Sequence, residues 1–107
     1  MSHLEDELHT QYRMAHLGSV KRQYRAIPGR RFAWDFAFPE NRILIEVHGG
    51  TWVRSGHTTG TGIARDCEKH NLATINGWHT LAFTKEHIRD GRALRWTQEA
   101  LTAHPPF

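Results

Sequence analysis

The chain has 107 residues and a mass of 12.4 kDa, the size of one domain, so we expect a single domain over residues 1–107. With one cysteine the chain forms no internal disulfide, and 38% hydrophobic residues with a net charge of only +3 indicate a packed globule rather than a disordered chain. No apolar stretch reaches the roughly 18–20 residues of a membrane span, and the N-terminus is too polar for a signal peptide, so we expect a cytoplasmic protein without a membrane partner.

The first 38 residues predict one helix and two strands. Ser2-His3-Leu4-Glu5 has the spacing of a capping box, and Leu4, Leu8, Tyr12 and Ala15 then line one face of a helix that ends near Gly18. Residues 20–27 predict a first strand. Residues 32–38 alternate strictly, which predicts a second strand with its aromatic side chains on one buried face: Phe32, Trp34, Phe36 and Phe38.

The remaining residues predict two more strands and two more helices. After a turn at residues 39–41, residues 42–48 predict a strand. One face of this strand carries Ile43, Ile45 and Val47, and the other carries Leu44, Glu46 and His48. A glycine-rich loop follows, then a helix over residues 64–76, a strand over 78–83, a short turn capped by Thr84 and a helix over 92–103. The second helix is expected to bury a stripe that includes Cys67, the others being Ala64, Asn71 and Ile75.

The element order α-β-β-β-α-β-α predicts an α/β fold. A hairpin followed by a helical crossover to a further strand favours a mixed four-stranded sheet with helices on its faces.

Basic residues concentrate between residues 13 and 31. This stretch contains six Lys or Arg side chains and no acid, whereas residues 1–12 contain three acids and no Lys or Arg. Such a block favours a surface that binds phosphates, although a solvated basic face has the same composition. The predicted contacts to a nucleic-acid backbone in this block are Arg22, Arg25, Arg30 and Arg31.

Two acidic residues face each other across the predicted hairpin. Pairing residues whose numbers sum to about 81 places Asp35 directly opposite Glu46. Opposed side chains stand about 4.5–5.5 Å apart, so these carboxylates repel unless a cation lies between them. Mg²⁺ prefers such oxygen ligands, and His48 shares their face. Separate ion pairs with an arginine are the alternative, the candidates for Asp35 being Arg30, Arg31 and Arg42.

The residues around these acids resemble the Asp…Glu-x-Lys core of the PD-(D/E)xK nuclease superfamily. The likeness is to small phage and bacterial endonucleases of the very-short-patch-repair-like and Holliday-junction-resolvase-like branches. The segments that carry the resemblance are Phe32–Phe36, Ile45-Glu46-Val47-His48-Gly49-Gly50, Trp52, His57 and Asp66-Cys67-Glu68-Lys69-His70-Asn71. The resemblance extends from Ser2 to Leu101 and implies a restriction-endonuclease-like core.

The resemblance also implies a metal site. Asp35 and Glu46 would be ligands of Mg²⁺, for which Mn²⁺ could substitute, and the backbone carbonyl of Val47 would be a third ligand. Glu5 matches an acid that resolvase-like members place on the first helix, although a helix-capping role explains the same position.

The family's usual lysine, two residues after the glutamate, is absent. His48 occupies its position, so the attacking water would be oriented either by His48 or by Lys69 on the following helix. Further contacts to phosphates are expected from His57, Arg65 and Asn71, with support of the metal site as the alternative role for Arg65 and Asn71.

These residues together predict a metal-dependent DNA endonuclease. A selectivity for branched DNA, as in a junction resolvase, is favoured, and a homodimer would suit two symmetric cuts. The alternatives are a mismatch or nicking endonuclease of the same fold, or a catalytically silent DNA-binding module in which His48 marks the lost activity.

Overall fold

A computed structural model describes residues 3–49 and 60–106 of the chain. The predicted element order is confirmed, with the turn after the fourth strand forming a short helix of its own. The elements are α1 (His3–Met14), β1 (Lys21–Tyr24), β2 (Trp34–Phe38), η1 (Pro39–Asn41), β3 (Ile43–Val47), α2 (Gly60–Ile75), β4 (His79–Phe83), α3 (Lys85–Arg89) and α4 (Arg92–Ala103). None of the helices in this part of the chain is long and apolar enough to cross a membrane.

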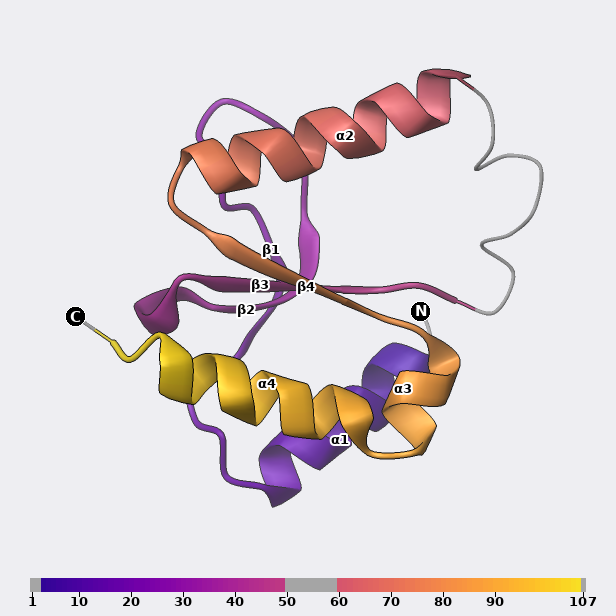
Figure 1. Ribbon diagram of the computed structural model, residues 1–107, viewed down its shortest axis with the longest axis vertical. Helices are drawn as coiled ribbons and strands as arrows, with labels where there is room; N and C mark the ends of the chain where they lie inside the picture. Colours follow the sequence, from indigo (N-terminus) through magenta and orange to yellow (C-terminus); the bar gives the residue numbers. More distant parts are fainter. Residues whose placement is uncertain (1–2, 50–59, 107) are drawn as a thin grey trace.

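The strands form one mixed four-stranded sheet between two helical layers. The strand order is β1-β2-β3-β4; the first two pairings are antiparallel, and β3 and β4 run parallel, joined by the crossover through α2. Helices α1, α3 and α4 cover one face, and α2 covers the other (Figure 1). The predicted α/β fold with a mixed four-stranded sheet is confirmed.

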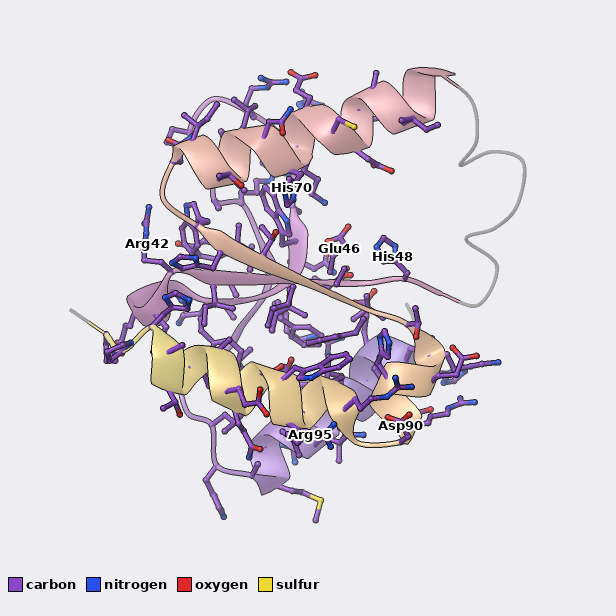
Figure 2. All side chains as sticks on the ribbon, viewed as in Figure 1. Arg42, Glu46, His48, His70, Asp90 and Arg95 are labelled. Carbon is purple, nitrogen blue, oxygen red and sulfur yellow. The ribbon has the colours of Figure 1, made fainter. Side chains whose placement is uncertain are left out.

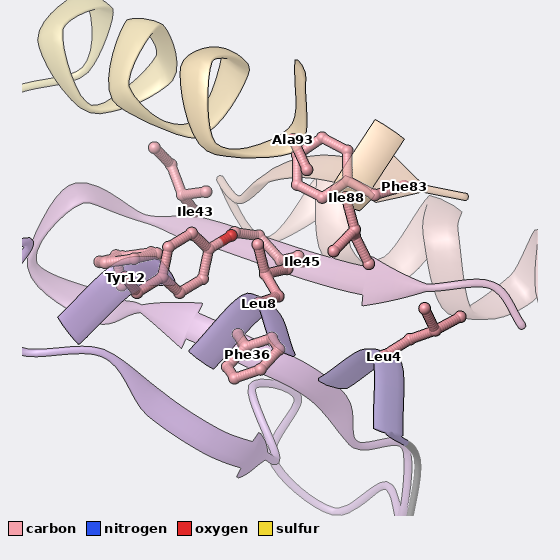
Figure 3. Packing of buried hydrophobic residues seen from close by; sticks show 10 residues of the cluster. Leu4, Leu8, Tyr12, Phe36, Ile43, Ile45, Phe83, Ile88 and Ala93 are labelled. Carbon is pink, nitrogen blue, oxygen red and sulfur yellow. The ribbon is translucent and has the colours of Figure 1, made fainter. Parts of the chain in front are cut away.

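The larger core lies between the sheet and the layer of α1, α3 and α4. The predicted face of α1 is buried at Leu4, Leu8 and Tyr12, because residues four apart lie on one side of a helix. These side chains pack against the sheet and the C-terminal helices (Figure 3), where the buried members are Phe36, Phe38, Ile43, Ile45, Phe83, Ile88 and Ala93. Ile43 and Ile45 lie on this face and Leu44 on the other, as the alternation predicted.

The predicted aromatic face of the second strand is wrong at its first half. Phe36 and Phe38 pack beneath α1 and α4, but Phe32 and Trp34 belong to the smaller core beside α2. The ladder between β2 and β3 covers only residues 36–38 of β2, whereas Trp34 pairs with Tyr24 of β1 alone. The β1–β2 ladder is interrupted between the pairs of Phe36 and Trp34, at Gln23, whose backbone φ is 49°, so the alternation of side chains is not continuous from Trp34 to Phe36.

The predicted buried stripe of the second helix is also wrong. Cys67 and Ile75 are exposed, and Ala73 is the side chain of α2 that packs fully against the sheet. Helix α2 begins at Gly60, four residues before the predicted start. Lys69 and Ala73 lie four residues apart, and both contact the sheet, so they mark the face of α2 that is turned toward it. The few apolar residues of α2 do not mark this face.

A buried hydroxyl pair joins α1 to α4 in the larger core. The Thr97 hydroxyl donates its proton to the carbonyl of Ala93 at 2.8 Å, so the Tyr12 hydroxyl must be the donor in its 2.9 Å hydrogen bond with Thr97 Oγ1. The pair therefore ties the two helices by one directed bond across 85 residues of sequence.

We expect Tyr12→Phe to lower the free energy of unfolding by about 1–2 kcal/mol, because one buried hydrogen bond is lost. Thr97→Val should be at least as destabilising, since it leaves the buried Tyr12 hydroxyl without its acceptor. Urea denaturation of both single variants and the double variant tests this. The double variant should lose less stability than the sum of the two, and full additivity would contradict the pairing.

Candidate active site

The predicted acids lie at the end of the β2–β3 hairpin where the two strands separate. The ladder pairs Phe36 with Ile45 and Phe38 with Ile43, which is the predicted register. Pairing stops one step before Asp35 and Glu46. The Asp35 carboxylate instead accepts a hydrogen bond from the Val47 backbone N–H at 2.7 Å, in place of a main-chain carbonyl. This bond holds Asp35 against the end of β3, next to Glu46.

Lys69 of α2 reaches across to the hairpin. Its ammonium lies 3.0 Å from Glu46 Oε2, 2.9 Å from the carbonyl of Ala33, and 4.7 Å from the centre of the Trp34 ring. The ion pair is partly buried, with 18% of the Lys69 side chain exposed. The lysine that the resemblance placed on the following helix therefore contacts the predicted catalytic glutamate directly. Trp34 was expected only as a core residue, but its ring also contacts the ammonium group of Lys69.

A third carboxylate approaches from the first turn of α1. Burial raises the pKa of Glu5, and the neighbouring Asp35 carboxylate raises it further. Glu5 also lies 3.7 Å from an Arg22 nitrogen and accepts a 3.3 Å hydrogen bond from Gln23, whose amide lies 3.5 Å from Asp35 Oδ1. Glu5, which the resemblance named as a metal ligand, thus lies beside Asp35.

The electrostatics of Glu46 depend on both of its neighbours. Burial raises the pKa of Glu46, the ammonium of Lys69 opposes this rise, and the charge of Asp35 adds to it. Its Oε2 atom is bound by Lys69, whereas Oε1 is buried without a hydrogen-bond partner among residues 3–49 and 60–106. A buried carboxylate oxygen without a donor is unfavourable, so this atom suits a cationic ligand.

The donor set fits a hard divalent cation that is shared with a substrate. In the described part of the chain, no three His, Cys, Asp or Glu side chains are grouped closely enough to hold a metal by themselves. Mg²⁺, however, is usually bound by one or two carboxylates together with water and phosphate oxygens. Asp35 and the unsatisfied oxygen of Glu46 meet that requirement.

His48 lies at the open side of the same site. Its backbone N–H donates to the carbonyl of Phe83 at 2.8 Å, and its side chain is exposed. Figure 2 shows Glu46 and His48 on the side of β3 that faces α2. Glu46, His48 and Lys69 line a pocket of about 290 Å³. Asp66 and His70 of α2 line the same pocket. Asp66 and His70 were not assigned a role from sequence. Asp66 lies three residues before Lys69, and His70 lies three residues before Ala73, so each shares a helix face with one of them. This spacing is the sequence signal that could have identified them.

The structure divides the predicted DNA-binding residues into two groups. Two arginines of the basic block have acidic partners within the chain: Arg22 binds Asp6 at 3.1 Å, and Arg30 forms an ion pair with Glu68. The others described are exposed, namely Arg25, Arg31, Arg65 and Asn71. His57 and Trp52 lie outside the described residues. The positive charge of the block is therefore partly balanced by residues from α1 and α2.

Sequence comparisons identify no relative of this chain. No family model matches the sequence, and no characterised protein matches it significantly. A solved structure does match its fold: the catalytic domain of the homing endonuclease I-Bth0305I superposes with a TM-score of 0.73 at 13% sequence identity, covering 98% of this chain and 99% of that domain. At this identity the likeness establishes the fold, which is that of an endonuclease catalytic domain.

Proposed function

We propose that this protein is a metal-dependent DNA endonuclease of the PD-(D/E)xK type. The observation that carries the proposal is the Lys69–Glu46 ion pair beside Asp35, at the splayed end of the β2–β3 hairpin. The fold shared with a homing endonuclease catalytic domain supports the same reaction class. Fold alone does not determine chemistry, so these side chains are what favour phosphodiester cleavage.

Asp35 and Glu46 would hold Mg²⁺ or Mn²⁺, with the Val47 carbonyl as a further ligand, and Glu5, which lies beside Asp35, would contact the ion through a bound water. When bound, such an ion lowers the pKa of a coordinated water and offsets charge on the phosphate. Lys69 is the residue best placed to orient the attacking water. An ammonium has three N–H donors, and its hydrogen bonds to Glu46 and Ala33 within the described residues leave one for that water.

The reaction is tested by incubating supercoiled plasmid with the protein in Mg²⁺, in Mn²⁺ and in EDTA. The proposal expects nicked or linear DNA with either metal and intact plasmid in EDTA. Intact plasmid in all three, with retained DNA binding, would instead favour the catalytically silent module.

The preferred DNA structure is a separate part of the proposal. We propose a preference for branched DNA, with cleavage by a homodimer, and a mismatch or nicking activity as the alternative. Cleavage rates on a four-way junction, a mismatched duplex and a matched duplex of the same sequence distinguish these. Paired cuts across the junction support the first, and single-strand cuts at the mismatch support the second.

DNA binding should depend steeply on salt, because the exposed arginines contact phosphates without reading bases. If about four phosphates are neutralised, affinity falls roughly 10²-fold between about 50 and 200 mM salt. Fluorescence anisotropy with a labelled duplex in EDTA measures this without cleavage. An affinity that stays flat over that range would contradict phosphate contacts by these residues.

A further inference from the structure

A second pocket lies next to the proposed active site, and most of the charged side chains that line it are cations. It has a volume of about 510 Å³ and is formed by residues 29–33 and the facing side of α2. The charged side chains in its lining are Arg30, Arg31, Arg65, Lys69, Asp66 and Glu68. Four cations against two acids make this an anion-attracting hollow, and the guanidinium groups can each bind a phosphate through two N–H donors.

Lys69 connects this pocket to the proposed active site. Lys69 and Asp66 line both pockets, so the two pockets adjoin at the lysine that binds Glu46. A nucleic-acid strand that presents one phosphate at Glu46 carries its neighbouring phosphates along the same surface. The cationic pocket therefore lies where a flanking phosphate would be.

Arg30 is already occupied by an internal anion. It forms an ion pair with Glu68, and its guanidinium lies 4.8 Å from the centre of the Phe32 ring. Both members of the pair remain solvent-accessible, with 39% of the Arg30 and 49% of the Glu68 side chain exposed. Such a pair is weak in water, so an incoming phosphate can displace the carboxylate.

We propose that this pocket binds a backbone phosphate of the DNA next to the cleaved bond, and that Glu68 competes with that phosphate for Arg30. This proposal rests on the proposed function, since it takes DNA as the ligand. Glu68 then acts as an internal substitute for phosphate that lowers affinity for every DNA. Its removal should tighten binding, because Arg30 is released and a carboxylate no longer repels the incoming backbone.

The first test compares Glu68→Gln with Glu99→Gln. Glu99 is exposed on α4, on the opposite face of the sheet, so both variants change the net charge equally but only one changes the pocket. Affinity for a fluorescein-labelled duplex is measured in EDTA. Glu68→Gln should bind about three- to tenfold tighter than the wild-type protein, and Glu99→Gln should differ little from it. Equal effects of the two variants, or weaker binding by Glu68→Gln, would overturn the proposal.

The second test compares Arg65→Gln with Arg95→Gln. Arg65 lines the pocket, whereas Arg95 is exposed on α4 at the far side of the sheet (Figure 2). Arg65→Gln should weaken binding about three- to tenfold. It should also reduce the magnitude of the slope of log affinity against log salt concentration by about 1, whereas Arg95→Gln should change neither quantity. Matching effects of the two variants would overturn the pocket as the phosphate site.

Failure of this inference differs from failure of the proposed function. If the wild-type protein cleaves plasmid but the matched variants behave alike, only the pocket assignment is wrong. If it never cleaves but the variants separate as expected, the pocket binds DNA in a protein without nuclease activity. Thermal unfolding of each variant should match the wild-type protein, because all four positions are exposed.

Discussion

The variants Asp35→Asn and Glu46→Gln should each lose DNA cleavage by about 10³-fold or more while still binding duplex DNA. Each removes a negative charge from the proposed metal site but keeps the size of the side chain. Loss of several kcal/mol of metal-dependent stabilisation corresponds to at least about 10³-fold in rate. Binding should persist or strengthen slightly, because an acid near the phosphate is neutralised. Initial rates of plasmid nicking in Mg²⁺, beside anisotropy in EDTA, measure the two quantities.

The control for this pair is Glu40→Gln. Glu40 lies in η1, at the other end of the hairpin, and is exposed. The Glu40→Gln variant should cleave DNA at the wild-type rate. Asp35→Asn retains an oxygen that can accept the Val47 N–H, so its unfolding midpoint should stay near that of the wild-type protein. A folded Asp35→Asn or Glu46→Gln protein that cleaves normally would contradict the metal-site proposal.

Replacing Lys69 with Met should slow cleavage by about 10²- to 10⁴-fold, the range for a positioned group that assists proton transfer or water orientation. Met keeps the apolar stem beside Trp34 but removes the ammonium that contacts Glu46 and Ala33. His48→Gln should have less than about a tenfold effect, because His48 is exposed and lies at the pocket's open side. The opposite order of effects would assign water orientation to His48.

The pH profile of Lys69→Met separates an electrostatic role from a structural one. In the wild-type protein Lys69 opposes the rise that burial causes in the pKa of Glu46. Without the ammonium that pKa rises further, and Glu46 is protonated at a higher pH. The residual activity should therefore be lost at a higher pH on the acidic side than in the wild-type protein. An unchanged acidic limb would contradict the coupling of these two residues.

Much of the hairpin could be predicted because its determinants are local. The alternation of residues 42–48 placed Ile43 and Ile45 in one core, and a short turn set the register that brings Asp35 to the end of β3. The face of α1 followed from the spacing of its apolar residues. Prediction was wrong at Trp34 and Cys67, where a strand leaves its ladder and a helix carries too few apolar residues to reveal its rotation.

The amino-acid sequence by itself determined the order of the elements, the hairpin register and the placement of Asp35 and Glu46 just beyond the paired residues, since these depend on patterns within a few residues. Only the tertiary structure decided which charges meet. Lys69 binds Glu46 across 23 residues of sequence, and Arg30 binds Glu68 across 38. Such pairs depend on how α2 packs on the sheet. The sequence shows that a charged side chain requires a partner when it is buried, but it does not show which residue that partner is.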